Sequence, residues 1–254
     1  MDHSGRRCPP GVLTVRDVVI VPIGSSAHLH PRHAIVIASG GLDSTVLAYW
    51  LAQRGAKLTL LCFDYGQRHR VELEYAAEIA RLLDCPHEIV DLTMLGRLLA
   101  GSALTDADVP VPDGHYTDES MRATIVPNRN AIMLDIAVSL AVVRKADVVA
   151  LGVHAGDHAV YPDCRPEFVE RYAEATRVAN EGLLDDDFEI LAPFIAQSKT
   201  DIVRIGAAFG VPFEKTWSCY RGGTTHCGTC GTCTERKEAF QQNGIPDPTN
   251  YGSV

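Results

Sequence analysis

The segment ASGGLDST, residues 38–45, places small and polar residues between two apolar runs. Gly40 and Gly41 would let the backbone curl closely around an anion, and a helix that begins there would direct its unpaired N–H groups at the same point. No lysine of the Walker type follows, so the loop is not the common P-loop. The alternative is a glycine turn in which Asp43 caps the helix. The residues therefore predict an anion-binding loop or a capped helix start.

Four cysteines near the C-terminus have the spacing of a metal site. Cys219, Cys227, Cys230 and Cys233 are separated by seven, two and two residues, and four thiolates can close a tetrahedral site. The spacing favours zinc, and an iron–sulfur cluster is the alternative. A redox C-x-x-C pair is the least favoured reading because it leaves two neighbouring cysteines unused. His226 is predicted to be solvated rather than a ligand.

The composition is that of a soluble globular protein. The chain has 254 residues, of which 46% are hydrophobic and 22% charged, and this length can bury one core with a small appendage. The net charge of -9 suits a nucleic-acid backbone poorly, so we expect a small-molecule partner.

The apolar runs predict neither a membrane span nor an export signal. The N-terminal GVLTVRDVVIVPI is broken by Arg16 and Asp17, and no apolar stretch reaches the length of a span. We therefore expect a cytoplasmic protein whose eight cysteines are thiols or metal ligands. Four of them lack partners in the sequence and are expected to be inert small hydrophobes: Cys8, Cys62, Cys85 and Cys164.

The elements that must position these groups alternate between strand and helix patterns. Short apolar runs at 33–39, 57–63, 87–92 and 147–153 are typical of buried parallel strands. Residues 44–54, 71–83 and 129–144 have helical length and periodicity. The alternation predicts an α/β fold with a doubly wound parallel sheet and a small C-terminal module.

Changes in composition divide the chain. Residues 1–32 are predicted to be a loose extension, 33–215 the α/β domain, and 216–254 a zinc module and tail in which Cys, Gly and Thr replace aliphatic residues. Residues 93–127 are rich in Asp, Pro, Gly and Thr and are too long for an idle connection. We predict that they form an active-site flap.

Four polar stretches follow strands or begin helices. They are FDYGQRHRVE at 63–72, VPNRN at 126–130, YPDCR at 161–165, and APFIAQSKTDIV at 192–203, in which Ser198 caps a helix with Lys199 in its first turn. Open α/β sheets bind ligands at the carboxyl ends of their strands, which is where the first and third of these stretches fall. Taken singly, each is also typical of an ordinary surface loop.

Together these stretches carry a resemblance to known enzymes. S-G-G-x-D-S after the first strand resembles the signature of the ATP pyrophosphatase superfamily. The chain as a whole resembles the 7-cyano-7-deazaguanine synthase family in the order of its motifs. These are SGGLDST, FDYGQRH, V-P-x-R-N, YPDCR, a lysine at a helix start, and TWSCY before the four cysteines. The resemblance covers residues 33 to about 245.

The resemblance implies a ligase that uses ATP to convert 7-carboxy-7-deazaguanine and ammonia into the nitrile through an acyl adenylate and an amide. It implies one structural zinc per chain and a homodimer. Asp43 would reach magnesium, and four cationic residues would grip phosphates or the substrate carboxylate, namely Arg68, Arg129, Arg165 and Lys199. The ATP-binding segment would comprise Ala38, Ser39, Gly40, Gly41, Leu42, Asp43, Ser44, Thr45, Val46, Leu47 and Ala48. The purine-like edge would be read by Asp64, Asn130, Asp157 and Asp163.

One departure from the family pattern leaves alternatives open. Residue 128 is Asn where the family usually has Gly; Asn tolerates a left-handed turn, but its side chain could alter the acceptor pocket. The first alternative is therefore a relative that couples the activated carboxylate to another amine. The second is a tRNA-thiolating relative with an iron–sulfur cluster, and the third is a nucleotide-sensing module without turnover.

Overall fold

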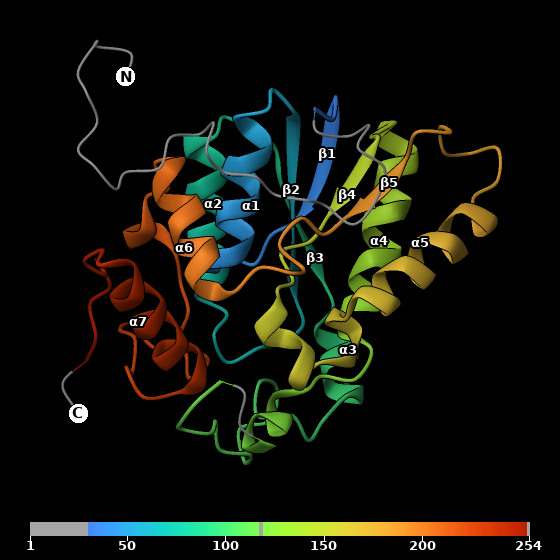
Figure 1. The fold of residues 1–254 in the computed structure, drawn as a ribbon. Coiled ribbons are helices and arrows are strands. Elements are labelled where there is room, and N and C mark those ends of the chain that lie inside the picture. The colour runs from blue at the N-terminus through green and yellow to red at the C-terminus, as the bar shows by residue number, and fades with distance from the viewer. Residues whose placement is uncertain (1–29, 117–118, 253–254) are drawn as a thin grey trace, which may run out of the picture.

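A single parallel sheet organises the molecule. The computed structural model describes residues 30–116 and 119–252, and its five strands lie in the order β3-β2-β1-β4-β5 (Figure 1). All four strand pairings are parallel. The strands are β1 (His33–Ile37), β2 (Lys57–Asp64), β3 (His87–Asp91), β4 (Val148–Ala150) and β5 (Glu189–Leu191). The predicted α/β fold and its four predicted strands are confirmed.

The central strands are apolar because helices cover both of their faces. In β1, Ala34, Ile35 and Val36 are completely buried, and Val36 pairs with Leu60 of β2 and Ala150 of β4. The prediction omitted β5 because this strand contributes only three residues, too few to show a period. β3, at the opposite edge, leaves Ile89 half exposed.

Helices cover the sheet in two layers (Figure 1). The helices are α1 (Leu42–Ala52), α2 (Glu72–Leu82), α3 (Thr93–Leu98), α4 (Arg129–Arg144), α5 (Pro166–Ala179), α6 (Lys199–Ala208) and α7 (Gly231–Asn243). Short 3-10 helices are η3 (Glu119–Thr124), η4 (Ala155–Ala159), η5 (Pro162–Cys164) and η6 (Phe213–Lys215). Helices α1, α2 and α6 pack on one face, and α4 and α5 pack on the other. The predicted helices correspond to α1, α2 and α4, and the helix predicted to begin after Ser198 is α6, with Ser198 as its N-cap.

The C-terminal segment packs against the same core. Ala239 and Phe240 of α7 belong to the apolar cluster beneath α1 and α6, and the ring of Phe240 meets Phe213 edge to face at 4.9 Å. The side chain of Arg236 is buried; it forms an ion pair with Asp247 and donates a hydrogen bond to the carbonyl of Phe213. Residues 216–252 therefore lie on the α/β domain, and the proposed domain boundaries stay a prediction.

Two predictions concern segments that the structure describes only in part. The predicted N-terminal extension falls mostly on residues 1–29, which lie outside the described residues. Within its described part, the backbone N–H of Arg32 donates to Oδ2 of Asp147. The expected flap is described as 93–116 and 119–127, and its Ala103 and Leu104 are fully buried. Among the helices of the described ranges, none is long and apolar enough to cross a membrane.

Candidate active site and metal centre

The glycine loop joins β1 to α1 in a conformation that only glycine suits. Gly40 has φ +81°, and a Cβ placed there would lie 2.1 Å from the carbonyl oxygen of Glu72. Gly41 caps α1 without any side-chain hydrogen bond, and the first helical bond runs from the N–H of Thr45 to its carbonyl. The reading of Asp43 as the cap is therefore wrong, since Asp43 is the second residue of the helix. The N–H groups of its first turn lie outside the helical ladder, as an anion site requires.

The residues of the predicted ATP-binding segment divide into two groups. Ala38, Ser39, Gly41, Leu42, Asp43 and Ser44 line the cavities at the carboxyl edge of the sheet. Val46, Leu47 and Ala48 are fully buried in the core beneath the loop, and Thr45 is almost so. The backbone of Gly40 packs on α2 instead. These five residues support the loop and do not face the cavities.

Two adjoining cavities, of about 200 and 110 Å³, lie in front of this loop. Six residues line both cavities, which makes them one continuous cleft: Ser39, Asp43, His69, Glu72, Tyr116 and Tyr220. The larger cavity also has apolar walls, including Phe63, Met133 and Leu151. An apolar cleft with convergent polar groups at this edge of the sheet is typical of a substrate site.

Lys199 stands between two carboxylates at the floor of the smaller cavity. Its Nζ lies 2.5 Å from Oδ2 of Asp43 and 3.3 Å from Oε2 of Glu235. Burial alone would lower the pKa of Lys199, but the two carboxylates outweigh this effect and hold the pKa above its usual value. Burial would likewise raise the pKa of Asp43, yet Lys199 holds it below its usual value. Lys199 therefore stays protonated, and Asp43 stays ionised.

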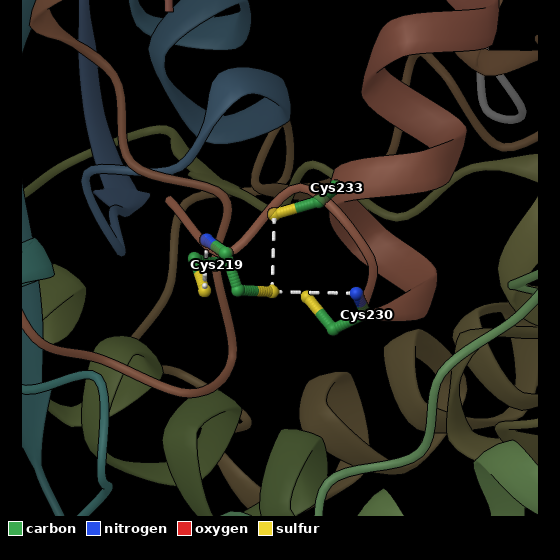
Figure 2. Close-up of side chains that lie close together, drawn as sticks. Cys219, Cys230 and Cys233 are labelled. Carbon is green, nitrogen blue, oxygen red and sulfur yellow. Dashed lines mark hydrogen bonds between the residues drawn. The ribbon is translucent and has the colours of Figure 1, made fainter. Parts of the chain in front are cut away.

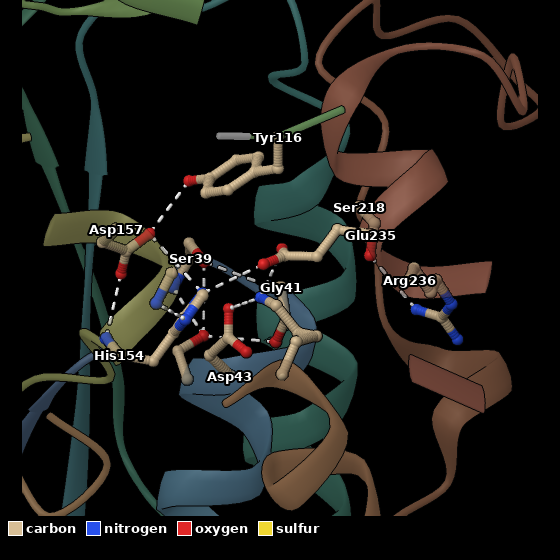
Figure 3. A network of polar contacts seen from close by, with 12 residues as sticks. Ser39, Gly41, Asp43, Tyr116, His154, Asp157, Ser218, Glu235 and Arg236 are labelled. Atoms are coloured by element: carbon tan, nitrogen blue, oxygen red, sulfur yellow. Dashed lines mark hydrogen bonds and ion pairs between the residues drawn. The ribbon is translucent and has the colours of Figure 1, made fainter. Parts of the chain in front are cut away.

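A hydrogen-bonded network joins the end of β4 to the loop after α3 (Figure 3). The hydroxyl of Tyr116 donates to Oδ1 of Asp157 at 2.9 Å, and the backbone N–H of His154 donates to Oδ2 at 2.9 Å. His154 and Asp157 form the capping box that begins η4. The predicted flap thus contributes Tyr116 to the cleft, and Asp157 has both carboxylate oxygens occupied.

The start of α4 places two predicted residues in the cleft. Arg129 lines the larger cavity and donates to the hydroxyl of Tyr65 at 3.3 Å, and the N–H of Asn130 donates to Asp163 at 3.1 Å. Asn128 precedes them as the N-cap in a left-handed conformation, with φ 58°. The expectation that Asn preserves this turn is confirmed. Asn128 is exposed and does not line either cavity.

Three other predicted residues are directed elsewhere. Arg68 donates through Nη2 to the carbonyls of Asp106 and Val109 and so braces the segment after α3. Nε of Arg165 donates to the carbonyl of His158, and Asp64 pairs with Arg70 at 2.6 Å. None of the three lines the two cavities. Of the four predicted cationic residues, Arg129 lines the larger cavity and Lys199 the smaller one. Arg236, which was not predicted, also lines the smaller cavity.

The four predicted metal ligands converge on one point. The sulfurs of Cys219, Cys227, Cys230 and Cys233 all lie within 4.8 Å of one another, and the Sγ atoms of Cys227 and Cys233 are 4.0 Å apart. Figure 2 shows Cys219, Cys230 and Cys233 close together. Zn–S bonds of about 2.3 Å in a tetrahedron would set sulfurs ~3.8 Å apart. Backbone N–H groups donate to the thiolates, such as that of Cys230 to Sγ of Cys227 at 3.3 Å. This cluster can hold a metal ion.

The prediction that His226 is solvated is wrong. Its side chain is buried, its Nε2 accepts a hydrogen bond from the N–H of Ser218 at 3.0 Å, and its ring lies 4.2 Å from that of Trp217. His226 is not among the clustered residues that could hold a metal, and its bond to Ser218 joins the segments that precede Cys219 and Cys227.

Several residues of the cleft escaped the sequence-based prediction. Tyr116, and His154 and Glu235 beside the cleft, come from segments with no pattern that marks them, and Tyr220 ends the TWSCY motif, in which no site role was predicted for it. His69, Glu72 and Tyr161 were present in the stretches FDYGQRHRVE and YPDCR, but only the fold shows that their side chains face or adjoin the cleft. Glu235 belongs to α7, whose N-cap is Cys230 of the cysteine cluster, and its carboxylate pairs with Lys199.

Comparison with known proteins finds similar sequences among 7-cyano-7-deazaguanine synthases. The 7-cyano-7-deazaguanine synthase of Rhizobium meliloti (strain 1021) is 57% identical over 217 residues, which cover 85% of this chain and 91% of that protein. The enzyme of the same name from Allorhizobium ampelinum is 55% identical with the same coverage. NMN synthetase from Francisella tularensis is a solved structure with 13% identity and a TM-score of 0.47, over 87% of this chain and 81% of that chain.

A family model supports the same relationship. The model described as queuosine biosynthesis protein QueC matches residues 33–244, which include the glycine loop, all of the cleft residues named above and the four cysteines. With curated relatives above one half identity over most of its length, the chain belongs to the QueC family of 7-cyano-7-deazaguanine synthases.

Proposed function

We propose that this protein converts 7-carboxy-7-deazaguanine and ammonia into 7-cyano-7-deazaguanine at the expense of ATP. The observation that carries the proposal is the identity of 57% to a 7-cyano-7-deazaguanine synthase, together with a cleft that joins the glycine loop to an apolar cavity. The product is a precursor for queuosine-type 7-deazapurines, in line with the family's description.

The cleft suits cleavage of ATP between its α and β phosphates. The first turn of α1 offers N–H groups to phosphate oxygens, and Lys199 adds a fixed positive charge beside them. Oδ1 of Asp43 is buried and has no hydrogen-bond partner among the described residues. A carboxylate oxygen of this kind is the ligand that Mg²⁺ prefers, and the ion would neutralise phosphate charge at this point.

The apolar cavity suits the deazapurine ring and its carboxyl group. Arg129 lies at its wall and would orient the carboxylate towards the α-phosphate of ATP. Transfer of AMP makes the carboxyl oxygen a leaving group, so ammonia can displace it and form the amide. A second adenylation, on the amide oxygen, prepares the loss of AMP that forms the nitrile. The protein's contribution is positioning, charge neutralisation and exclusion of water.

We propose zinc as the metal at the four cysteines, with a structural role. Four thiolates would leave no open coordination position for a substrate. The metal would hold the turn before α7, and α7 in turn supplies Glu235 to Lys199 and Arg236 to the smaller cavity. An iron–sulfur cluster would colour the protein brown, whereas zinc leaves it colourless.

We also propose ammonia as the acceptor, a homodimer as the working form, and the cytoplasm as its location. The exposed position of Asn128, away from both cavities, gives no support to a different amine. Sedimentation of the purified protein would measure the oligomeric state.

The test is incubation with ATP, ammonium and 7-carboxy-7-deazaguanine, with mass spectrometry of every product. We expect nitrile and two AMP for each nitrile formed. Asp43→Asn should abolish AMP formation, while Asp186→Asn, which changes an exposed carboxylate, should not. ADP as the first nucleotide product would refute cleavage at the α-phosphate, and an amide that accumulates despite excess ATP would indicate a ligase that stops after one adenylation.

A further inference from the structure

Glu72 occupies a position that the proposed function does not yet use. It is the first residue of α2, and its side chain is only 10% exposed. It lines both cavities, so it stands where they meet. His69 lies beside it, with Nε2 3.5 Å from Oε1 of Glu72, and is also buried.

The glycine loop holds Glu72 next to the site of carboxyl activation. The two segments are in close contact, because a Cβ on Gly40 would lie 2.1 Å from the carbonyl oxygen of Glu72 and 2.8 Å from the backbone nitrogen of Ala76. The start of α2 therefore rests directly on the loop that would bind the ATP phosphates.

Glu72 differs from the other two carboxylates that line the cleft. Asp43 is paired with Lys199, and Asp157 accepts hydrogen bonds from Tyr116 and from the backbone of His154. Among the described residues, the hydrogen bond to Glu72 comes from the uncharged side-chain amide of Gln67, at 3.2 Å. Glu72 thus lacks the ion pair that holds Asp43, and among the described residues one hydrogen bond from an uncharged amide holds it, whereas both carboxylate oxygens of Asp157 are occupied.

The proposed reaction needs such a group twice. When ammonia attacks the acyl adenylate, the new C–N bond leaves a positive nitrogen that must lose a proton as AMP departs. In the second half, the adenylated amide is a cation with two N–H protons. Loss of the first proton gives the neutral adenylated imidate; as the second proton leaves, its electron pair forms the third C–N bond and the C–O bond breaks to release AMP. Each step needs a base close to the activated carbon.

We propose that Glu72 is the base that accepts these protons, an inference that rests on the proposed function. Its carboxylate takes the proton from nitrogen at the junction of the cavities and returns it to solvent between the two half-reactions. A structural acid at the start of α2, favoured there by the helix dipole, would not respond to the state of the substrate nitrogen.

The charge environment suits this role. Burial raises the pKa of Glu72 to about 8, against the opposing effects of Gln67 and Arg129. Burial and the charge of Arg129 lower the pKa of His69 to about 3, so His69 is neutral and does not compete for the proton. The other titratable or charged residues that line the two cavities are Asp43, Asp157, Arg129, Lys199, Arg236, Cys164, Tyr65, Tyr116, Tyr161 and Tyr220. A base works best when its pKa lies near the working pH.

The experiment starts from the amide, 7-carbamoyl-7-deazaguanine, because this substrate makes the nitrile without ammonia and removes the titration of ammonium from the pH profile. In the parent protein, nitrile formation should rise with pH and level off near pH 8, where Glu72 becomes ionised. Glu72→Gln should slow this step by about 100-fold or more and lose the rise, since general bases contribute roughly 10²–10⁴ in rate. Glu72→Asp, which keeps a carboxylate, should retain the pH dependence at a reduced rate.

Pyrophosphate exchange into ATP with the carboxylic acid measures adenylation alone, and Glu72→Gln should retain it. The matched control is Glu74→Gln, which removes an exposed carboxylate from the same first turn of α2 and should behave as the parent. If Glu72→Gln forms nitrile at the parent rate and with the parent pH profile, or loses adenylation together with the nitrile, Glu72 is not the base. A parent protein without acid-dependent exchange would instead overturn the proposed function.

Discussion

Replacement of Lys199 by Met should destabilise the protein, because it removes one charge and strands two others. The Lys199 side chain is 13% exposed, and its Nζ lies 2.5 Å from Asp43 and 3.3 Å from Glu235, whose side chains are 25% and 14% exposed. Breaking a buried pair by removing one partner costs about 3–5 kcal/mol. Since a quarter of the Asp43 side chain remains in contact with water, we expect a loss near the low end, about 3 kcal/mol.

The pH dependence gives this prediction a sign. In the parent, Lys199 holds the pKa of Asp43 below its usual value, so the ion pair stabilises the fold above the unfolded pKa and is lost as the pH falls through the folded pKa. In Lys199→Met, two buried carboxylates face each other without a cation, and their protonation relieves the repulsion. The difference in stability between variant and parent should therefore shrink as the pH falls from 7 towards about 5.

Urea unfolding at both pH values measures these differences. Lys57→Met, which replaces an exposed lysine at the start of β2, is the control and should unfold like the parent. Lys199→Met should also lose acid-dependent pyrophosphate exchange, because the charge of Lys199 lies beside Asp43 in the loop that we propose binds the ATP phosphates. An unfolding free energy of Lys199→Met within about 0.5 kcal/mol of the parent at pH 7 would refute the assignment of Lys199 as the counter-ion of two buried carboxylates.

Three further predictions concern the loop, the metal and the departure from the family pattern. Gly40→Ala should lower the free energy of unfolding by more than about 2 kcal/mol in a thermal unfolding experiment, because φ is positive and the new Cβ would clash with the carbonyl of Glu72. Gly55→Ala is the control, since Gly55 has the same φ of +81° but open space around it, and it should lose only the conformational part, about 1 kcal/mol. Cys230→Ser should lower the zinc content measured by atomic absorption and the melting temperature together, whereas retained zinc would contradict the four-ligand site. Asn128→Gly should change stability by no more than about 1 kcal/mol and leave the product a nitrile; a changed product would support a different acceptor.

The order of the elements could be predicted because each depends on neighbouring residues. Apolar runs marked β1 to β4, Ser198 as a cap marked the start of α6, and glycines marked the loop after β1. The same local chemistry placed the polar stretches at the carboxyl edge of the sheet, since parallel strands all end on that side. The short strand β5 escaped because its three residues have no period, although it pairs with β4 along its whole length.

Cationic residues show where prediction from local patterns ends. Arg68 and Arg129 both stand in motifs that follow or begin an element, and both were expected to grip phosphate or carboxylate. The guanidinium of Arg129 lines the cavity, whereas that of Arg68 is satisfied by two carbonyls of the segment after α3. The direction of a long side chain depends on the acceptors that the fold brings near it, and these come from residues about forty positions away in sequence.

The sequence by itself determined the family, the alternation of strands and helices, the glycine loop and the four cysteines that could hold a metal. Each of these depends on residue types at short, constant spacings, and such local patterns do not depend on how distant parts of the chain pack. Only the tertiary structure decided that Lys199 pairs with Asp43 across 156 positions, that Glu235 of α7 completes this cluster, and that Glu72 faces the junction of the cavities. Their electrostatic character arises from burial and from partners on separate elements, and both come into being only when the helices pack on the sheet.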